Sequence, residues 1–149
     1  NAAGTFYRKL GTNQLFIYGE DAVNNTKTDV GYVRVTLPAN YVSGGLLSIR
    51  ARAGVILNGD AALTAATIDF EAYLMATDGT VGSDLVSTSA TAITTTIGDK
   101  DFVITPTGLV PGSTLIIKMT TVVQETASGT GAANAKLPGL WLLGDLVAV

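Results

Sequence analysis

The chain has 149 residues, a formal net charge of −3, and neither histidine nor cysteine. Without imidazole or thiol groups it is excluded from zinc, haem and thiolate chemistry, and its scattered basic residues argue against nucleic-acid binding, which needs a clustered positive face. Only 14% of the residues are charged while 47% are hydrophobic, which favours a protein that assembles with others over an enzyme.

β-Branched and polar residues alternate along most of the chain, and Gly, Pro, Asn and Asp interrupt the alternation at turns. This pattern predicts an all-β protein, an antiparallel β-sandwich in a single domain. Every uncharged stretch is shorter than the roughly 18 apolar residues that a membrane-spanning helix needs, so no membrane span is expected. The predicted strands are, in chain order, Thr5–Leu10, Gln14–Tyr18, Gly31–Leu37, Leu46–Leu57, Thr67–Ala76, Ala92–Ile97, Asp101–Thr105, Thr114–Glu125 and Leu137–Val147.

The first predicted strand, Thr5–Leu10, is amphipathic and lies near a chain end. Such a segment can be an arm that adds a strand to a partner's sheet, or it can be the first strand of the protein's own sheet. Both alternatives stay open. The predicted division is therefore an N-terminal arm or first strand over residues 1–12 and a β-sandwich domain over residues 13–149.

The fourth and fifth predicted strands share a pattern that predicts how they pair. Arginines alternate with apolar side chains in the fourth strand, and carboxylates do so in the fifth. A hairpin of the two strands places Arg50 opposite Glu71 and Arg52 opposite Asp69 on one face, with apolar side chains on the other. A slip of one residue would set apolar side chains against the charged face, so this register is the predicted one.

Asp69 and Glu71 also allow a second interpretation, since two carboxylates on one face of a strand can act as the acid and base of a glycosidase. An arginine beside each carboxylate would keep it ionised, whereas a general acid needs a raised pKa. Structural pairing of these four residues is therefore the preferred interpretation.

Other motifs that carry chemistry are missing or weak. The sequence contains no serine–lysine pair at catalytic spacing, no nucleophile elbow and no glycine-rich phosphate loop. The segment Asp78–Asp84 has oxygen ligands that could hold calcium, but its acidic residues are few, which favours an ordinary turn. We therefore expect no catalytic residue, no metal and no cofactor, and predict that the protein is not an enzyme.

The last predicted strand, Leu137–Val147, is apolar on both faces apart from Asp145. Continuous apolar runs are typical of strands that are covered on both sides. Trp141 in this run has three interpretations: a platform on which a sugar stacks, an anchor at a protein interface, or a core residue. Its apolar neighbours favour the core.

Three stretches taken together are distinctive: Val33–Gly45 (VRVTLPANYVSGG), Ile68–Tyr73 followed by Asp78–Leu85 (IDFEAY, DGTVGSDL), and Asp99–Gly112 (DKDFVITPTGLVPG). In this order they resemble a group of small proteins encoded in the head-gene regions of marine tailed bacteriophages and related prophages. The better understood members of that group look like capsid decoration, or cement, proteins. The resemblance covers roughly residues 30–149, and its motifs specify strands and turns rather than a binding site.

The resemblance implies a jelly-roll-like antiparallel β-sandwich on the outer surface of the capsid of a virion that is assembled in the host cytoplasm. The implied partners are the phage major capsid protein and further copies of the chain, as a trimer at three-fold or quasi-three-fold positions, with no nucleic acid and no membrane. Contacts that span neighbouring subunits would resist the pressure of packaged DNA. Under this hypothesis the N-terminal segment makes the subunit or capsid contact through Thr5, Phe6, Tyr7, Arg8, Lys9 and Leu10.

Two alternatives from other classes remain. One is a receptor- or carbohydrate-binding β-sandwich domain of a head or tail fibre, and the other is a structural subunit of a tail tube or pilus. The first would need exposed aromatic side chains on which sugars stack. The aromatic candidates for this role are Tyr18, Tyr32, Tyr41, Tyr73 and Trp141.

Overall fold

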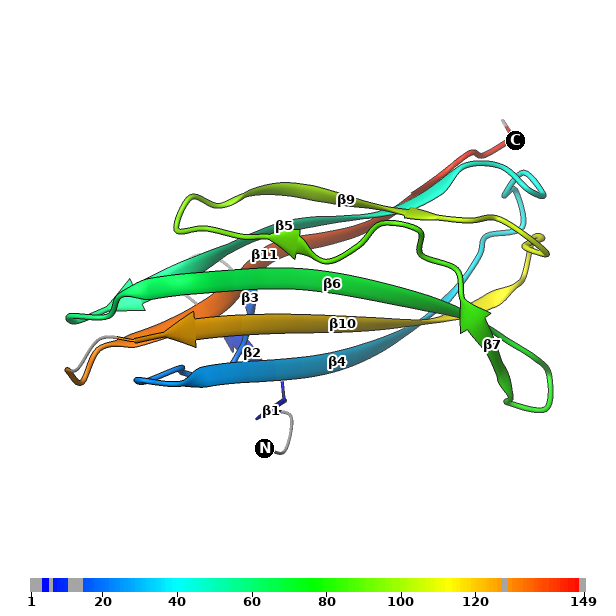
Figure 1. The fold of residues 1–149 in the computed structure, drawn as a ribbon. Coiled ribbons are helices and arrows are strands. Elements are labelled where there is room, and N and C mark those ends of the chain that lie inside the picture. The colour runs from blue at the N-terminus through cyan, green and yellow to red at the C-terminus, as the bar shows by residue number, and fades with distance from the viewer. Residues whose placement is uncertain (1–3, 6, 11–14, 127–128, 148–149) are drawn as a thin grey trace.

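The computed structural model describes residues 4–5, 7–10, 15–126 and 129–147, with side chains from residue 17 onward. These residues form two β-sheets packed face to face (Figure 1), which confirms the predicted all-β sandwich. No described segment is a helix that could cross a membrane. The strands are β1 (Gly4–Thr5), β2 (Tyr7–Leu10), β3 (Leu15–Tyr18), β4 (Thr26–Thr36), β5 (Leu47–Asn58), β6 (Leu63–Met75), β7 (Val81–Asp84), β8 (Thr91–Ala92), β9 (Gly98–Ile104), β10 (Thr114–Glu125) and β11 (Ala132–Gly144).

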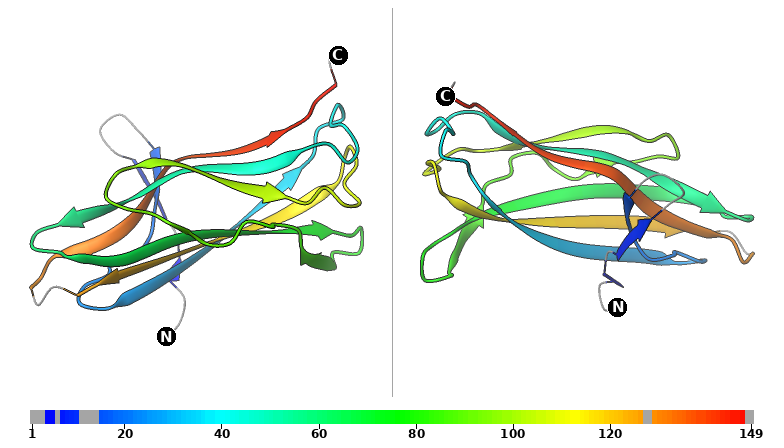
Figure 2. Two further views of the ribbon diagram at one scale, coloured as in Figure 1. Left: turned by 45° about the horizontal axis from the view of Figure 1, so that its top comes forward. Right: turned by 180° about the vertical axis from the view of Figure 1, so that it is seen from behind.

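The strand order is that of a jelly roll. One sheet, here called sheet A, has the order β1-β4-β10-β6-β7, with β8 also paired to β6, and the other, sheet B, has the order β2-β3-β11-β5-β9. Early strands therefore pair with late ones: β3 with β11, β4 with β10 and β5 with β9. This is a long hairpin rolled up so that successive strands change sheet, which is the jelly-roll arrangement. Figure 2 shows the two layers from two further directions.

The observed strands differ from the predicted ones mainly at their ends. β4 begins at Thr26 and β6 at Leu63, both earlier than predicted, and β7 was not predicted. Of the predicted strand Ala92–Ile97 only Ala92 lies in a strand, β8. Thr94 bonds locally instead: its hydroxyl oxygen accepts the Thr96 N–H at 3.2 Å. Such a local hydrogen bond offers the backbone an alternative to the sheet ladder.

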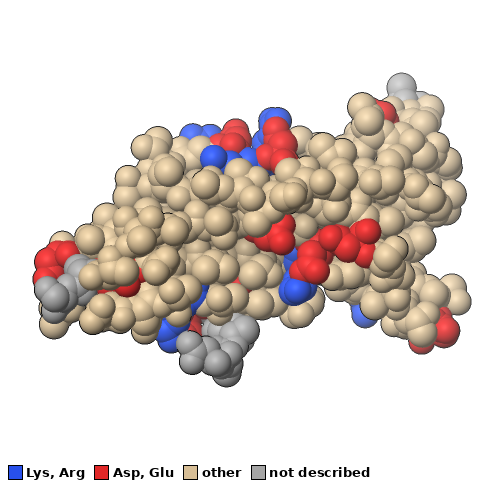
Figure 3. All heavy atoms as spheres, in the orientation of Figure 1, with Lys and Arg blue, Asp and Glu red and all other residues tan. Residues whose placement is uncertain are grey.

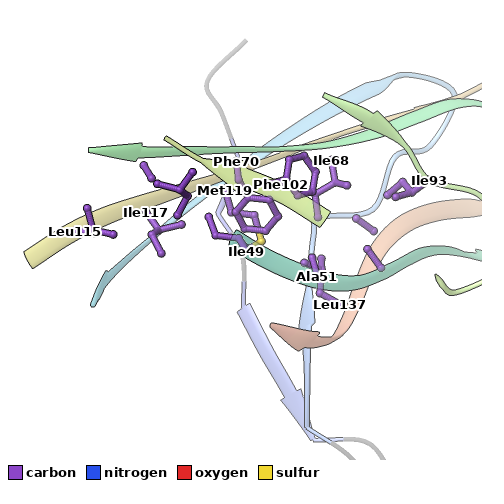
Figure 4. Packing of buried hydrophobic residues seen from close by; sticks show 14 of the residues in the cluster. Ile49, Ala51, Ile68, Phe70, Ile93, Phe102, Leu115, Ile117, Met119 and Leu137 are labelled. Atoms are coloured by element: carbon purple, nitrogen blue, oxygen red, sulfur yellow. The ribbon is translucent and has the colours of Figure 1, made fainter. Parts of the chain in front are cut away.

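The core lies between the sheets and is made of inward residues from both. The apolar faces predicted for β5 and β6 are buried, with Ile49 and Phe70 among their residues, and Ile117 of β10 is buried as well. Phe70 of sheet A meets Phe102 of sheet B edge to face, with ring centroids 4.9 Å apart, so this pair joins the two layers at the centre of the core (Figure 4).

Asp29 is a carboxylate buried within this apolar interior. Its side chain is fully buried on β4, where Oδ2 accepts the Glu20 N–H at 3.0 Å and Oδ1 has no hydrogen-bond partner among the described residues. A β-carbon at Gly19 would lie 2.3 Å from Oδ2, so glycine there allows the close approach. Burial raises the pKa of Asp29, and the hydrogen bond from Glu20 offsets part of that rise.

Replacing Asp29 with asparagine tests this arrangement. In the unfolded chain the carboxyl ionises near its ordinary pKa of about 3.9, whereas the folded protein keeps the proton to higher pH. The contribution of Asp29 to the free energy of unfolding therefore falls as pH rises through the window between its two pKa values. We expect Asp29→Asn, which cannot titrate and still accepts from Glu20, to abolish this fall and to be at least as stable as wild type at pH 7. Urea unfolding at several pH values between about 3.5 and 7 measures both quantities. If the free energy of unfolding changed with pH in the same way in the variant and in wild type, the assignment would be contradicted.

Candidate functional site

Trp141 lies on the outer face of sheet B, not in the core. Along β11, Leu140 and Leu142 point inward and pack against the core, while Trp141 and Leu143 point outward and are 46% and 38% exposed. The predictions of a core tryptophan and of a strand covered on both faces are therefore wrong. Both faces of β11 are apolar, but none of the described residues forms a third layer over its outer side at Trp141. The remaining interpretations are therefore a stacking platform and an interface anchor.

The indole ring of Trp141 lies over the backbone of Gly139. A β-carbon added at Gly139 would fall 2.2, 2.7 and 2.8 Å from Cη2, Cζ3 and Cζ2 of the ring. The two residues are two positions apart on one strand, so they share a face, and the ring occupies the space that a side chain at position 139 would fill. Glycine therefore lets the ring lie down on the sheet.

An ion pair stands beside this ring. Arg50 of β5 is directly opposite Trp141 on one side and Asp101 of β9 on the other. The guanidinium donates Nε–H to Oδ1 of Asp101 at 2.7 Å and Nη2–H to Oδ2 at 2.8 Å. This bidentate pairing lowers the pKa of Asp101 and raises that of Arg50. Planar charge-assisted pairs of this kind have defined geometry, so the polar flank of Trp141 is ordered.

The partners predicted for the two arginines are wrong. Arg52 pairs with Asp99, 3.6 Å from Nη1 to Oδ1, and Arg50 pairs with Asp101, whereas Asp69 and Glu71 lie in the other sheet. β5 and β6 are not a hairpin: they face each other across the core with their apolar sides. The alternation correctly separated the charged from the apolar face of each strand. However, β9 carries carboxylates with the same spacing as β6, and β9 rather than β6 pairs with β5.

Glu71 and Asp69 occupy the outer face of sheet A. Glu71 forms an ion pair with Lys118 and accepts the Tyr73 hydroxyl at 2.6 Å, and these bonds lower the pKa of Glu71 and raise that of Tyr73 to about 12. Asp69 stands opposite Thr120, and burial raises its pKa. The structural interpretation assumed that each of these carboxylates has an arginine beside it. Instead, Glu71 pairs with one lysine, Lys118.

One end of the sandwich carries most of the exposed apolar side chains. We call it the apolar end, and it consists of segments 37–46, 76–82, 105–114 and 143–147. These segments contain only two charged residues, Asp78 and Asp145, and this end of the molecule is largely uncharged at the right of Figure 3. Its exposed apolar residues are Val42, Leu46, Val81, Val110, Leu143, Leu146 and Val147.

Three segments of the apolar end, 37–46, 105–114 and 143–147, are tied to one another by backbone hydrogen bonds. Leu37 N–H donates to Ser113 O at 2.8 Å, and Val42 N–H donates to Asp145 O at 3.0 Å. Two grooves lie between the loops: one of about 670 Å³ beside β7, lined by Val81 and Val110 among others, and one of about 350 Å³ at the end of β11. The apolar surface is therefore preformed.

The N-terminal segment pairs with the protein's own sheets. β1 adds to the edge strand β4 of sheet A, and β2 pairs with β3 in sheet B, which matches the alternative of a first strand. Thr5, Tyr7, Arg8, Lys9 and Leu10 belong to these strands, and Phe6 lies outside the described residues. Their contact with a subunit or a capsid stays a prediction.

Tyr41, another predicted stacking residue, and the candidate calcium segment have structural roles. Tyr41 is buried and donates its hydroxyl to Gly45 O at 2.6 Å, while Tyr32 is 69% exposed on sheet A. Asp78 accepts the Thr80 N–H at 2.9 Å in a turn. Among the described residues no cluster of three or more acidic side chains could hold a metal ion.

No protein-family model matches the chain, and no curated protein matches its sequence. Among solved structures, the chain is similar to the xylan-binding domain CBM22-1 of Paenibacillus barcinonensis Xyn10C, with 11% identity, a TM-score of 0.50, and coverage of 96% of this chain and 81% of that one. A structure described as "CBM4 structure and function" has 13% identity, a TM-score of 0.43, and coverage of 93% and 88%. The infectious bursal disease virus Gt strain structure has 14% identity, a TM-score of 0.36, and coverage of 90% and 36%. At these identities the likeness extends to the β-sandwich fold alone.

Proposed function

We propose that the protein is a virion structural protein, a decoration protein that binds the outside of a tailed-phage head and stabilises the shell. The observation that carries the proposal is the apolar end. Large exposed apolar patches mark sites of association, and this one is built from loops that are hydrogen-bonded to each other, so little order has to be gained on docking. The jelly-roll sandwich is the fold that the resemblance to decoration proteins implies.

The proposed action is mechanical. The apolar end docks on neighbouring capsid subunits or on further copies of the chain, and each contact is modest. Symmetric placement of a trimer at three-fold or quasi-three-fold positions adds the contacts together, because binding one site raises the effective concentration at the next. Each trimer then links several capsid subunits and resists their separation under internal pressure.

Charged substitutions in the apolar end test this proposal. We expect Leu46→Asp and Leu143→Asp to reduce binding to undecorated heads at least ten-fold, because a carboxylate would have to lose its water in an apolar contact. Bound copies per head, measured by co-sedimentation, report the loss. Val23→Asp is the control matched to Leu143→Asp, since Val23 is exposed at 40% and Leu143 at 38%. Val23 lies beside Ala22, which bridges to the opposite end of β11 at Ala133. Unchanged head binding by both apolar-end variants would refute the assignment.

A further inference from the structure

We propose that the outer face of sheet B around Trp141 is a saccharide-binding site, in which a pyranose ring stacks on the indole and its hydroxyls bond to the Arg50–Asp101 pair. The proposal goes beyond capsid decoration and does not depend on it. The site lies inward along β11 from the apolar end, so a protein docked through its end loops can still present it.

The first support is the exposure and orientation of the Trp141 side chain. A large aromatic side chain is stabilised by burial, yet Trp141 remains 46% exposed in a fold whose core has buried Phe70 and Phe102 almost completely. The ring rests on Gly139, where a β-carbon would fall 2.2 Å from Cη2. One side of the indole is thus supported by backbone, which makes a flat shelf on the sheet surface.

The second support is the polar flank. A guanidinium has about five N–H donors and a carboxylate about four acceptor sites, and the Arg50–Asp101 pair uses two of each. The remaining donors and acceptors are held by the bidentate geometry at the edge of the shelf. A second pair, Arg52–Asp99, lies in the next row beside Gly139, so two arginines of β5 stand next to β11, each with its carboxylate one strand further away on β9.

This combination selects a ligand with an apolar face and a rim of hydroxyls. A pyranose has both: C–H groups on one face, and equatorial hydroxyls that each donate and accept. Phosphate-bearing ligands are disfavoured, because each arginine is already paired with a carboxylate and the surface carries no net positive charge there. A protein docked over the ring would have to remove water from both ion pairs, which are exposed here, and removing water from charged groups costs free energy.

Fluorescence gives a direct test, because Trp141 is the only tryptophan in the chain. The purified full chain is titrated with the hexaoses of β-1,4-linked glucose, xylose, mannose and N-acetylglucosamine, up to about 10 mM, a range that detects binding free energies of a few kcal/mol. We expect at least one hexaose to shift the emission in a saturable way. Calorimetry then measures the variants: Trp141→Ala is expected to lose at least ten-fold in affinity and Asp101→Ala to be weakened. Gly139→Ala, which keeps the tryptophan but lifts its ring, is expected to weaken binding as well.

Two controls distinguish a saccharide site at Trp141 from non-specific stacking and from a protein interface. Tyr32→Ala removes an exposed aromatic from the outer face of sheet A, and its saccharide affinity is expected to equal that of wild type. Trp141→Ala is expected to retain binding to undecorated heads. No emission shift with any hexaose would overturn the proposal, as would equal loss in Tyr32→Ala. If wild type bound no saccharide and Trp141→Ala no longer bound heads, this face would instead be a protein interface.

Discussion

Replacing Phe70 with alanine is expected to lower the free energy of unfolding by about 3–5 kcal/mol, the range measured for phenylalanine deletions in packed cores. Phe70 is 1% exposed and contacts Phe102 from the opposite sheet edge to face. The substitution removes the ring that fills the space between the two layers. The surrounding strands are held in two hydrogen-bonded sheets and cannot collapse into the gap, so the value should lie in the upper part of this range.

Equilibrium unfolding in urea, followed by far-ultraviolet circular dichroism, measures this loss as a lower midpoint at an unchanged slope. Tyr32→Ala is the control on the same sheet, because Tyr32 is 69% exposed and a surface substitution is expected to stay within about 0.5 kcal/mol of wild type. A loss below about 1 kcal/mol for Phe70→Ala would mean that the two sheets are not packed through this ring pair.

The face that each residue occupies was predictable from the sequence. Side chains alternate along a strand, so the apolar faces of β5 and β6 followed from the pattern, and Ile49 and Phe70 are buried as expected. The turn residues also separated most strands correctly. β7 was missed because its four residues, Val-Gly-Ser-Asp, are all exposed and carry no alternation to detect.

The strand partners were not predictable in the same way. Arg50 and Arg52 need two carboxylates at matching spacing, and both β6, with Asp69 and Glu71, and β9 supply them. Charge complementarity contributes only about 0.2–1 kcal/mol per pair, so it cannot decide between two candidate strands. The rolled-up connectivity decides instead, by sending β5 and β6 to opposite sheets.

The exposure of Trp141 in the candidate saccharide site was likewise not predictable from the local sequence. Apolar neighbours on both sides of Trp141 suggested burial, but alternation assigns Leu140 and Leu142 inward and the tryptophan outward. Whether the outer face is covered depends on a third layer, about which the local sequence carries no information. The one local signal was Gly139, since glycine inside a strand often marks a close approach of another group.

Replacing Glu125 with alanine is expected to lower the free energy of unfolding by about 3 kcal/mol or more, because hydrogen bonds to a charged group contribute about 1.5–3 kcal/mol each. Glu125 is 1% exposed at the end of β10. Its Oε2 accepts the Asn24 N–H at 2.5 Å and its Oε1 accepts the Ala62 N–H at 3.0 Å. One carboxylate therefore fastens the β3–β4 and β5–β6 connections to β10, at the end of the sandwich opposite the apolar end.

The matched control for this substitution is Glu20→Ala. Glu20 is also a carboxylate with a partner, Lys27 at 3.2 Å, but its side chain is 41% exposed, and exposed ion pairs contribute little. The two variants remove the same group from a buried and an open position, so urea unfolding should separate them clearly. Equal midpoints would show that the hairpin tips hold together without the buried carboxylate. A much lower midpoint for Glu125→Ala than for Glu20→Ala would show that Glu125 holds that end of the sandwich together. The alanine variant would leave the N–H groups of Asn24 and Ala62 without their acceptor.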